Sequence, residues 1–210
     1  MAKARKVKKS KALPTGATGL CEGTDLRTPF GERKIENLRQ GDLVVTRDNG
    51  LQPVRLIWAR TLTKAEVAAD PSLAPVYFAP RAIGPMMPKR ALQVGAAHRL
   101  LIPGWRLEDE DDTTSCLIPA RDVDGLSLGN EGDPDEVTYY NIVFDEPQVF
   151  SANGLPVESF TPSEETLAFS PKDVREAMRS LFPDLGPKFA DYPTPRYKVR
   201  ERASYTPDWA

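Results

Sequence analysis

Twenty prolines, spread through a chain of 210 residues, constrain this sequence more than any other feature. Proline has no amide hydrogen and interrupts helices and interior strands, so long helices are disfavoured and short strands joined by turns are favoured. Five prolines fall between residues 70 and 90. We expect residues 64–90 to be irregular, with room for one short helix at 64–69.

Several short apolar runs have the composition of strands and end at turn residues. Residues 42–46 (DLVVT) are followed by Asn49-Gly50, and residues 149–150 by Asn153-Gly154. Asn-Gly pairs accept positive φ and are typical of tight hairpins. Residues 100–102 and 139–144 (YYNIVF) are further strand candidates. The pattern predicts a mainly β chain built from hairpins.

One later segment has the pattern of an amphipathic helix. Ser170 suits the N-cap, Pro171 the first helical position, and Pro183 ends the segment. Apolar residues recur on one helical face, at Val174, Ala177, Met178, Leu181 and Phe182. We predict that this helix packs on the β domain. From Gly186 the chain is rich in proline and aromatic residues, and it either wraps the surface or serves as a linear segment for binding a protein partner.

The net charge of −2 excludes little, but the charge is unevenly distributed. Residues 1–18 begin with a basic run and are expected to be a disordered tail. The alternative is contact with nucleic acid or an anionic surface through Lys3, Arg5, Lys6, Lys8, Lys9 and Lys11. No apolar run is long enough to span a membrane or to form a signal peptide. The expected location is therefore cytoplasmic by default, with non-classical secretion left open.

The residues able to ligate a soft metal are few. The chain has two cysteines, Cys21 and Cys116, and a single histidine, His98. This set is too small for a zinc cluster, so no metal or cofactor is expected. The two cysteines could pair in one disulfide, but nothing in the sequence requires it.

Residues 23–46 read GTDLRTPFGERKIENLRQGDLVVT, and blocks Ala97-His98-Arg99 and Glu158-Ser159-Phe160 follow in order. In order and spacing these motifs resemble the Hint (hedgehog/intein) domain family, especially the bacterial group typical of alphaproteobacteria. The resemblance spans about residues 19–183. It implies a curved, pseudo-symmetric, mainly β fold with one C-terminal helix. The expected layout is a tail at 1–18, a Hint-like domain at 19–162, a packed helix at 163–185 and a second tail at 186–210.

Self-cleaving members of this family start from a cysteine whose thiol attacks the preceding carbonyl, while a histidine protonates the leaving nitrogen. The resemblance assigns these catalytic roles to Cys21 and His98, and the bond cleaved would be Leu20–Cys21. Three departures stand against this chemistry. Cys21 lies two residues too close to Gly23-Thr24, Gly95 replaces the hydroxyl residue three positions before His98, and Pro147 replaces a second histidine.

For the Hint-like domain two functions therefore remain open from the sequence, and a third is the contact with nucleic acid or an anionic surface through the basic tail. The first is a degenerate Hint domain that acts as a binding or structural module and is not an enzyme. The second is an autoprocessing domain that cleaves before Cys21 and releases residues 1–20. A two-residue slip along an extended strand moves a thiol by about 6.6 Å, which is beyond hydrogen-bond reach of a fixed histidine. This distance favours the first function.

Overall fold

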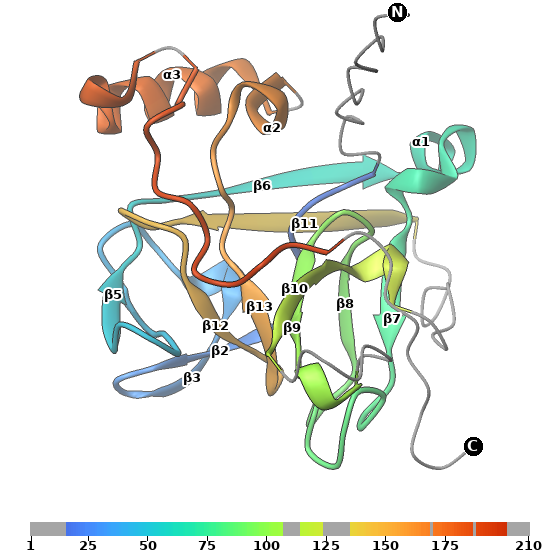
Figure 1. Ribbon diagram of the computed structural model, residues 1–210. Helices are drawn as coiled ribbons and strands as arrows, with labels where there is room; N and C mark the ends of the chain where they lie inside the picture. The colour runs from blue at the N-terminus through green and yellow to red at the C-terminus, as the bar shows by residue number, and fades with distance from the viewer. Residues whose placement is uncertain (1–15, 107–113, 124–134, 169, 187, 201–210) are drawn as a thin grey trace, which may run out of the picture.

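The computed structural model describes residues 16–106, 114–123, 135–168, 170–186 and 188–200 (Figure 1). The basic residues for which we predicted contact with nucleic acid or an anionic surface, at positions 3–11, lie outside the described residues, as do residues 201–210 of the C-terminal tail.

The described chain is built mainly from two antiparallel sheets, which confirms the predicted mainly β fold. The five-stranded sheet runs in the order β6 (Leu56–Thr63), β11 (Glu136–Val143), β1 (Leu20–Cys21), β8 (Leu92–Gly95) and β7 (Pro75–Phe78). The six-stranded sheet runs β10 (Cys116–Pro119), β9 (Arg99–Ile102), β13 (Leu155–Glu158), β12 (Val149–Ala152), β2 (Asp25–Thr28) and β3 (Gly31–Lys34). A separate pair joins β4 (Leu43–Val45) to β5 (Leu51–Pro53).

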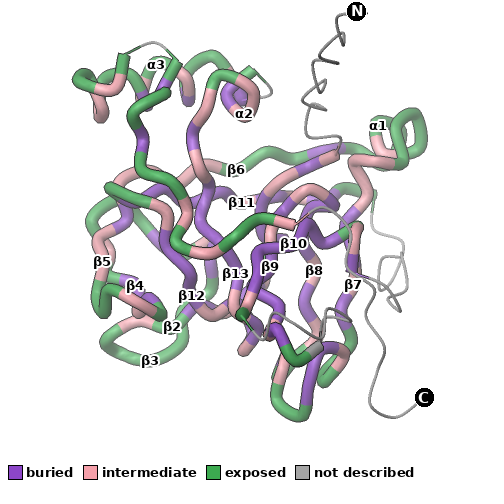
Figure 2. The backbone as a smooth tube through the Cα atoms, in the orientation of Figure 1, coloured by how far each residue is buried: buried purple, intermediate pink, exposed green. Residues whose placement is uncertain are grey.

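The largest hydrophobic cluster draws residues from both main sheets and from the β4–β5 pair. It includes Leu20 of β1, Leu100 of β9 and Val157 of β13, each at most 1% exposed. In Figure 2 the buried parts of the tube run through these central strands. The core therefore fixes β1, the first described strand, in the middle of the five-stranded sheet, where it pairs with β8 and β11.

The two Asn-Gly pairs behave differently. Asn153 and Gly154 form the predicted two-residue turn between β12 and β13, with φ of 47° and 91°. At Asn49-Gly50 only the glycine has positive φ, and Val45 pairs with Leu51 across a five-residue loop. The predicted hairpin forms, but its loop is longer than a two-residue turn: Thr46 donates its amide to the Gly50 carbonyl and also bridges with Phe150 of β12.

Within the described ranges three α-helices lie outside the sheets, whereas the sequence predicted one amphipathic helix and one short candidate. They are α1 (Lys64–Ala69), α2 (Glu164–Ala168) and α3 (Lys172–Leu181). The predicted N-cap of α3 is wrong by one residue: Pro171 occupies that position with no side-chain cap, and the Ser170 hydroxyl bonds to the Thr166 carbonyl instead. Val174 and Met178 are buried on the predicted apolar face.

The chain after α3 lies against the domain as a strap, which we define as residues 188–200. Phe189 and Tyr192 join the cluster formed by α2, α3, Val143 and Phe160, and the Tyr192 hydroxyl donates to the Phe144 carbonyl at 2.8 Å. Further on, Leu117 of edge strand β10 exchanges backbone hydrogen bonds with Lys198 and Arg200. Of the two alternatives predicted for this tail, surface wrapping is the one seen over these residues.

Two further sequence questions concern thiols and membranes. Cys21 and Cys116 are both free and buried, so the disulfide left open by the sequence is not formed. Among the described residues, no helix has the length and apolar character needed to cross a membrane.

The strap's contribution to stability can be measured at Tyr192. We expect Tyr192→Phe to lower the free energy of unfolding by about 1 kcal/mol through loss of one buried hydrogen bond. Tyr192→Ala should cost about 3 kcal/mol because it also empties a buried site. Urea titrations followed by circular dichroism measure both, with Phe30→Ala as the control, since Phe30 is 99% exposed. Equal midpoints for Tyr192→Ala and the wild type would show that the strap is not part of the folded core.

Candidate functional site

The segment leading into β1, residues 16–19, is held by backbone hydrogen bonds on both sides. The Ala17 amide donates to the Ser72 carbonyl, and the Ala97 amide donates to the Ala17 carbonyl at 2.9 Å. The Gly95 amide donates to the Gly19 carbonyl at 2.8 Å. The segment is thus an extension of the sheet, laid directly over the turn that precedes His98.

His98 contacts the backbone of Gly19 rather than the side chain of Cys21. The Gly19 amide donates to Nδ1 of His98 at 3.3 Å. Because Nδ1 accepts this bond, the neutral ring carries its proton on Nε2, which has no hydrogen-bond partner among the described residues. Burial, with the nearby Arg99 cation, lowers the pKa of His98 from 6.5 to about 3. The imidazole is therefore neutral at physiological pH and acts here as an acceptor.

Asn141 of β11 holds the other side of the same peptide bond. Its Nδ2 donates to the Thr18 carbonyl at 3.3 Å. A carbonyl only accepts hydrogen bonds, so the amide nitrogen is the atom that faces Thr18. Asn141 is 6% exposed, and its Oδ1 has no partner within the described part of the chain. The Thr18–Gly19 peptide is thus held at its nitrogen by His98 and at its oxygen by Asn141, an arrangement we name the peptide clamp.

Two glycines allow the chain to pass through the peptide clamp. A Cβ at Gly95 would lie 2.3 Å from the Ala17 carbonyl oxygen, a distance at which backbone atoms must move. Gly19 has φ of 116°, and a Cβ there would lie 2.9 Å from the Tyr140 carbonyl. A side chain at either position would displace the N-terminal segment, so neither a thiol at residue 19 nor a hydroxyl at residue 95 has room here.

Cys21, the predicted nucleophile, lies two residues farther along β1. It pairs with Tyr139 of β11 and packs with Ala17 and Leu62 in a small apolar cluster. Burial raises the pKa of its thiol from 9.0 to about 12, which keeps the sulfur protonated and a poor nucleophile. No hydrogen bond joins it to His98 in the described chain. The structure therefore does not bring the two predicted catalytic residues together.

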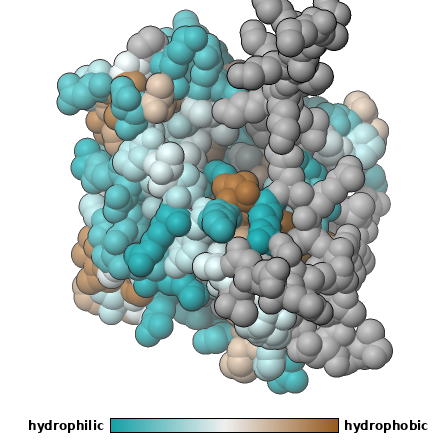
Figure 3. Space-filling model, in the orientation of Figure 1, coloured by the Kyte–Doolittle hydropathy of each residue, from teal (hydrophilic) through white to brown (hydrophobic). Residues whose placement is uncertain are grey.

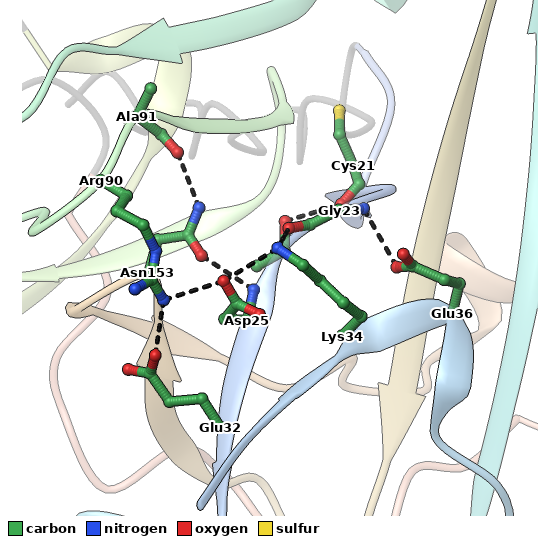
Figure 4. A network of polar contacts seen from close by, with 10 residues as sticks. Cys21, Gly23, Asp25, Glu32, Lys34, Glu36, Arg90, Ala91 and Asn153 are labelled. Atoms are coloured by element: carbon green, nitrogen blue, oxygen red, sulfur yellow. Dashed lines mark hydrogen bonds and ion pairs between the residues drawn. The ribbon is translucent and has the colours of Figure 1, made fainter.

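A network of polar contacts centred on Asp25 holds β1 and β2 where they leave their sheets (Figure 4). The Asp25 carboxylate pairs with Lys34 at 2.9 Å and with Arg90 at 2.8 Å. Asn153, at the β12–β13 turn, accepts from the Asp25 amide and donates to the Ala91 carbonyl. Figure 4 shows the Cys21 sulfur pointing away from these groups. These polar groups have their partners within the network, and the network therefore positions β1 and β2.

A buried ion pair lies next to His98 in sequence. Arg99 Nε and the Glu158 carboxylate are 2.5 Å apart, and Glu158 is 3% exposed. Burial raises the pKa of Glu158 to about 7, while the Arg99 cation opposes that rise. Glu158 belongs to the Glu-Ser-Phe block that the sequence analysis recognised as a motif without assigning it a role.

Sequence reasoning missed Asn141 as a site residue. The signal available was a single polar residue inside the apolar run YYNIVF, at a position that alternation buries. No group of three His, Cys, Asp or Glu side chains in the described ranges is arranged to hold a metal ion.

Comparison with known proteins gives one family match. Residues 18–164 match the family model described as the Hint domain. Among solved structures, the gp41-1 intein is similar with 16% identity and a TM-score of 0.41, covering 67% of this chain and 98% of the intein. The MchDnaB-1 intein is similar with 15% identity and a TM-score of 0.40, covering 67% of this chain and 99% of the intein. The bacterial intein-like domain from Clostridium thermocellum is similar with 14% identity and a TM-score of 0.40, covering 69% of this chain and 99% of that domain. A search of curated proteins found no match.

The depressed pKa of His98 predicts a pH dependence of stability. The unfolded chain binds a proton at this residue near pH 6.5, whereas the native state does so only near pH 3. Between these values the unfolded state holds more protons, so stability falls as pH falls, by at most about 1.4 kcal/mol per pH unit. We expect the stability difference between the wild type and His98→Gln to shrink at that rate from pH 6 to pH 4.5 in urea titrations. Parallel curves for the two proteins would contradict the buried neutral imidazole.

The close approach at Gly95 gives a second prediction. Gly95→Ala should destabilise the protein by about 3 kcal/mol or free the N-terminal segment, because the added methyl meets the Ala17 carbonyl. Thermal unfolding and limited trypsin digestion measure the two effects. Gly23→Ala is the control: Gly23 has φ of 82° with no atom within 4 Å of its Cβ position, so only backbone strain of about 1 kcal/mol applies. Equal costs for the two variants would argue against the close approach.

Proposed function

Because the chain belongs to the Hint domain family, we propose that it is a member that retains its N-terminal segment and acts as a binding or structural module. The family assignment covers residues 18–164. Membership of the bacterial group typical of alphaproteobacteria remains a prediction from sequence motifs.

One observation carries this proposal: the peptide bond that His98 contacts is Thr18–Gly19, and Gly19 has no side chain. Self-cleavage in this family requires a nucleophile on the residue that follows the scissile bond. In this chain the residue that follows the clamped Thr18–Gly19 bond is a glycine, which has no nucleophilic side chain. The absence of room for a side chain at Gly95 supports the same reading, because the helper hydroxyl cannot be restored by a simple substitution.

The alternative is cleavage of Leu20–Cys21 through a thioester, with Cys21 and His98 as the catalytic pair. Against it, Leu20 is paired with Tyr140 on one side and Val94 on the other, so this peptide lies in the centre of a sheet. The thiol would also have to lose its proton in an apolar environment, where its pKa is about 12. Both conditions oppose attack on the Leu20 carbonyl.

Mass spectrometry of the purified full-length chain separates the two functions. We expect the intact mass to remain that of 210 residues after prolonged incubation with dithiothreitol or hydroxylamine at pH 7. Cys21→Ala and His98→Gln serve as matched controls and should give the same result.

A fragment that begins at Cys21, and that disappears in Cys21→Ala, would establish the thioester alternative instead. A fragment that begins at Gly19 and requires His98 would contradict both readings, because the peptide clamp would then be cleaved without a neighbouring side-chain nucleophile.

A further inference from the structure

A cleft of about 410 Å³ opens beside the peptide clamp. Its walls come from the N-terminal segment at Gly16–Thr18, the connection after α1 at Asp70–Leu73, and the start of α3 at Ser170 and Pro171. Its floor comes from β6 and β11, above which α2 and α3 lie in Figure 1. This volume falls in the range of sites for small molecules.

The floor is a regular block of four side chains. Trp58 pairs with Asn141, and Arg60 pairs with Tyr139, across the β6–β11 ladder. Residues two apart on a strand share a face, so all four project from the same side of the sheet. Diagonal neighbours such as Arg60 and Asn141 lie about 8 Å apart at the backbone. The block thus places a cation and an amide at opposite corners of an aromatic surface.

The aromatic surface is fixed in place. Trp58 packs edge-on against Phe160 with ring centroids 4.8 Å apart, and both residues line the cleft. Tyr139 is 1% exposed, with its hydroxyl donated to the Leu73 carbonyl at 2.7 Å. Trp58 and Phe160, whose rings stand nearly perpendicular to each other, offer an apolar surface on which a ligand ring can pack.

At the floor of the cleft, the Oδ1 atom of Asn141 is a hydrogen-bond acceptor without a donor in the described chain. Its Nδ2 is used by the Thr18 carbonyl, while Oδ1 is buried and lacks a partner in the described chain. A buried acceptor without a donor costs about 1–3 kcal/mol. A ligand with a hydroxyl group would satisfy it.

One cation lines the cleft and can attract a negative charge. Arg60 is exposed on edge strand β6. The first turn of α3, which begins beside the cleft, already carries the Asp173 carboxylate, so the attraction for an anion comes from the guanidinium. The one carboxylate on the wall, Asp70, is engaged by the amide and hydroxyl of Ser72.

From these features we propose that the cleft binds a small aromatic hydroxy acid. Its ring lies against Trp58 and Phe160, its hydroxyl donates to Asn141 Oδ1, and its carboxylate pairs with Arg60. The inference rests on the proposed function, since it gives the binding module a ligand class.

The other exposed apolar residues offer no comparable site. Among the described residues, Leu43 and Leu51 lie on the short β4–β5 pair, and the rest are dispersed: Phe30, Met86, Trp105 and Val199. The described surface in Figure 3 is mostly hydrophilic. The cleft is the place where aromatic, cationic and unpartnered amide groups meet.

Calorimetric titration of the full-length protein tests the proposal with 6-hydroxy-2-naphthoate as the probe. We expect saturable binding that weakens about tenfold for the neutral 6-hydroxy-2-naphthamide, through loss of the charge-assisted contacts. Binding should weaken about fivefold for 2-naphthoate, which lacks the hydroxyl. In ¹H–¹⁵N spectra the indole signal of Trp58, assigned with Trp58→Phe, should shift on addition of the probe.

Arg60→Gln should reduce affinity for the acid about tenfold and leave affinity for the amide unchanged. Arg27→Gln is the matched control, because Arg27 is also exposed on a strand but lies in the other sheet. Equal affinities for acid and amide, no effect of the hydroxyl, or a response to Arg60→Gln no larger than to Arg27→Gln would overturn the proposal. The intact mass of the same sample reports separately on the proposed function, since cleavage would refute the module whatever the titration gives.

Discussion

The passage of the N-terminal segment over Gly95 is the contact on which the rest of the site depends. The Ala17 carbonyl occupies the space that any larger side chain at residue 95 would need. From there the chain enters β1 between β8 and β11, and the sheet fixes its register. Because that register is fixed, the Gly19 amide donates to His98, and Cys21 lies two residues farther along the strand.

The burial of this segment also sets the protonation of His98 and Cys21. An imidazole surrounded by apolar groups and an adjacent arginine remains neutral, and a buried thiol remains protonated. Both groups are then good packing and hydrogen-bonding partners, but neither is poised for proton transfer or attack near pH 7. Two hydrogen bonds, one with His98 and one with Asn141, hold the Thr18–Gly19 peptide in place.

Local patterns in the sequence predicted local structure well. The Asn153-Gly154 turn and the buried face of α3 follow from residue preferences over a few positions. The five-residue loop at Thr46–Gly50 does not, because Thr46 also bridges with Phe150 of β12, which is distant in sequence. The uncapped start of α3 does not either, because the Ser170 hydroxyl bonds to the Thr166 carbonyl instead. The departure of Cys21 from the family's spacing was readable by counting residues, whereas the role of Asn141 required knowing that β11 lies beside the N-terminal segment.

The central place of β1 has a consequence for how the chain acquires its shape during synthesis. This strand leaves the ribosome before both of its neighbours, and the later of them, β11, ends at residue 143. The β1–β11 side of the sheet therefore closes only after more than a hundred further residues have been made, through contacts between residues that far apart. Such long loops make folding slow, and one edge of the nascent β1 stays unpaired until β11 emerges.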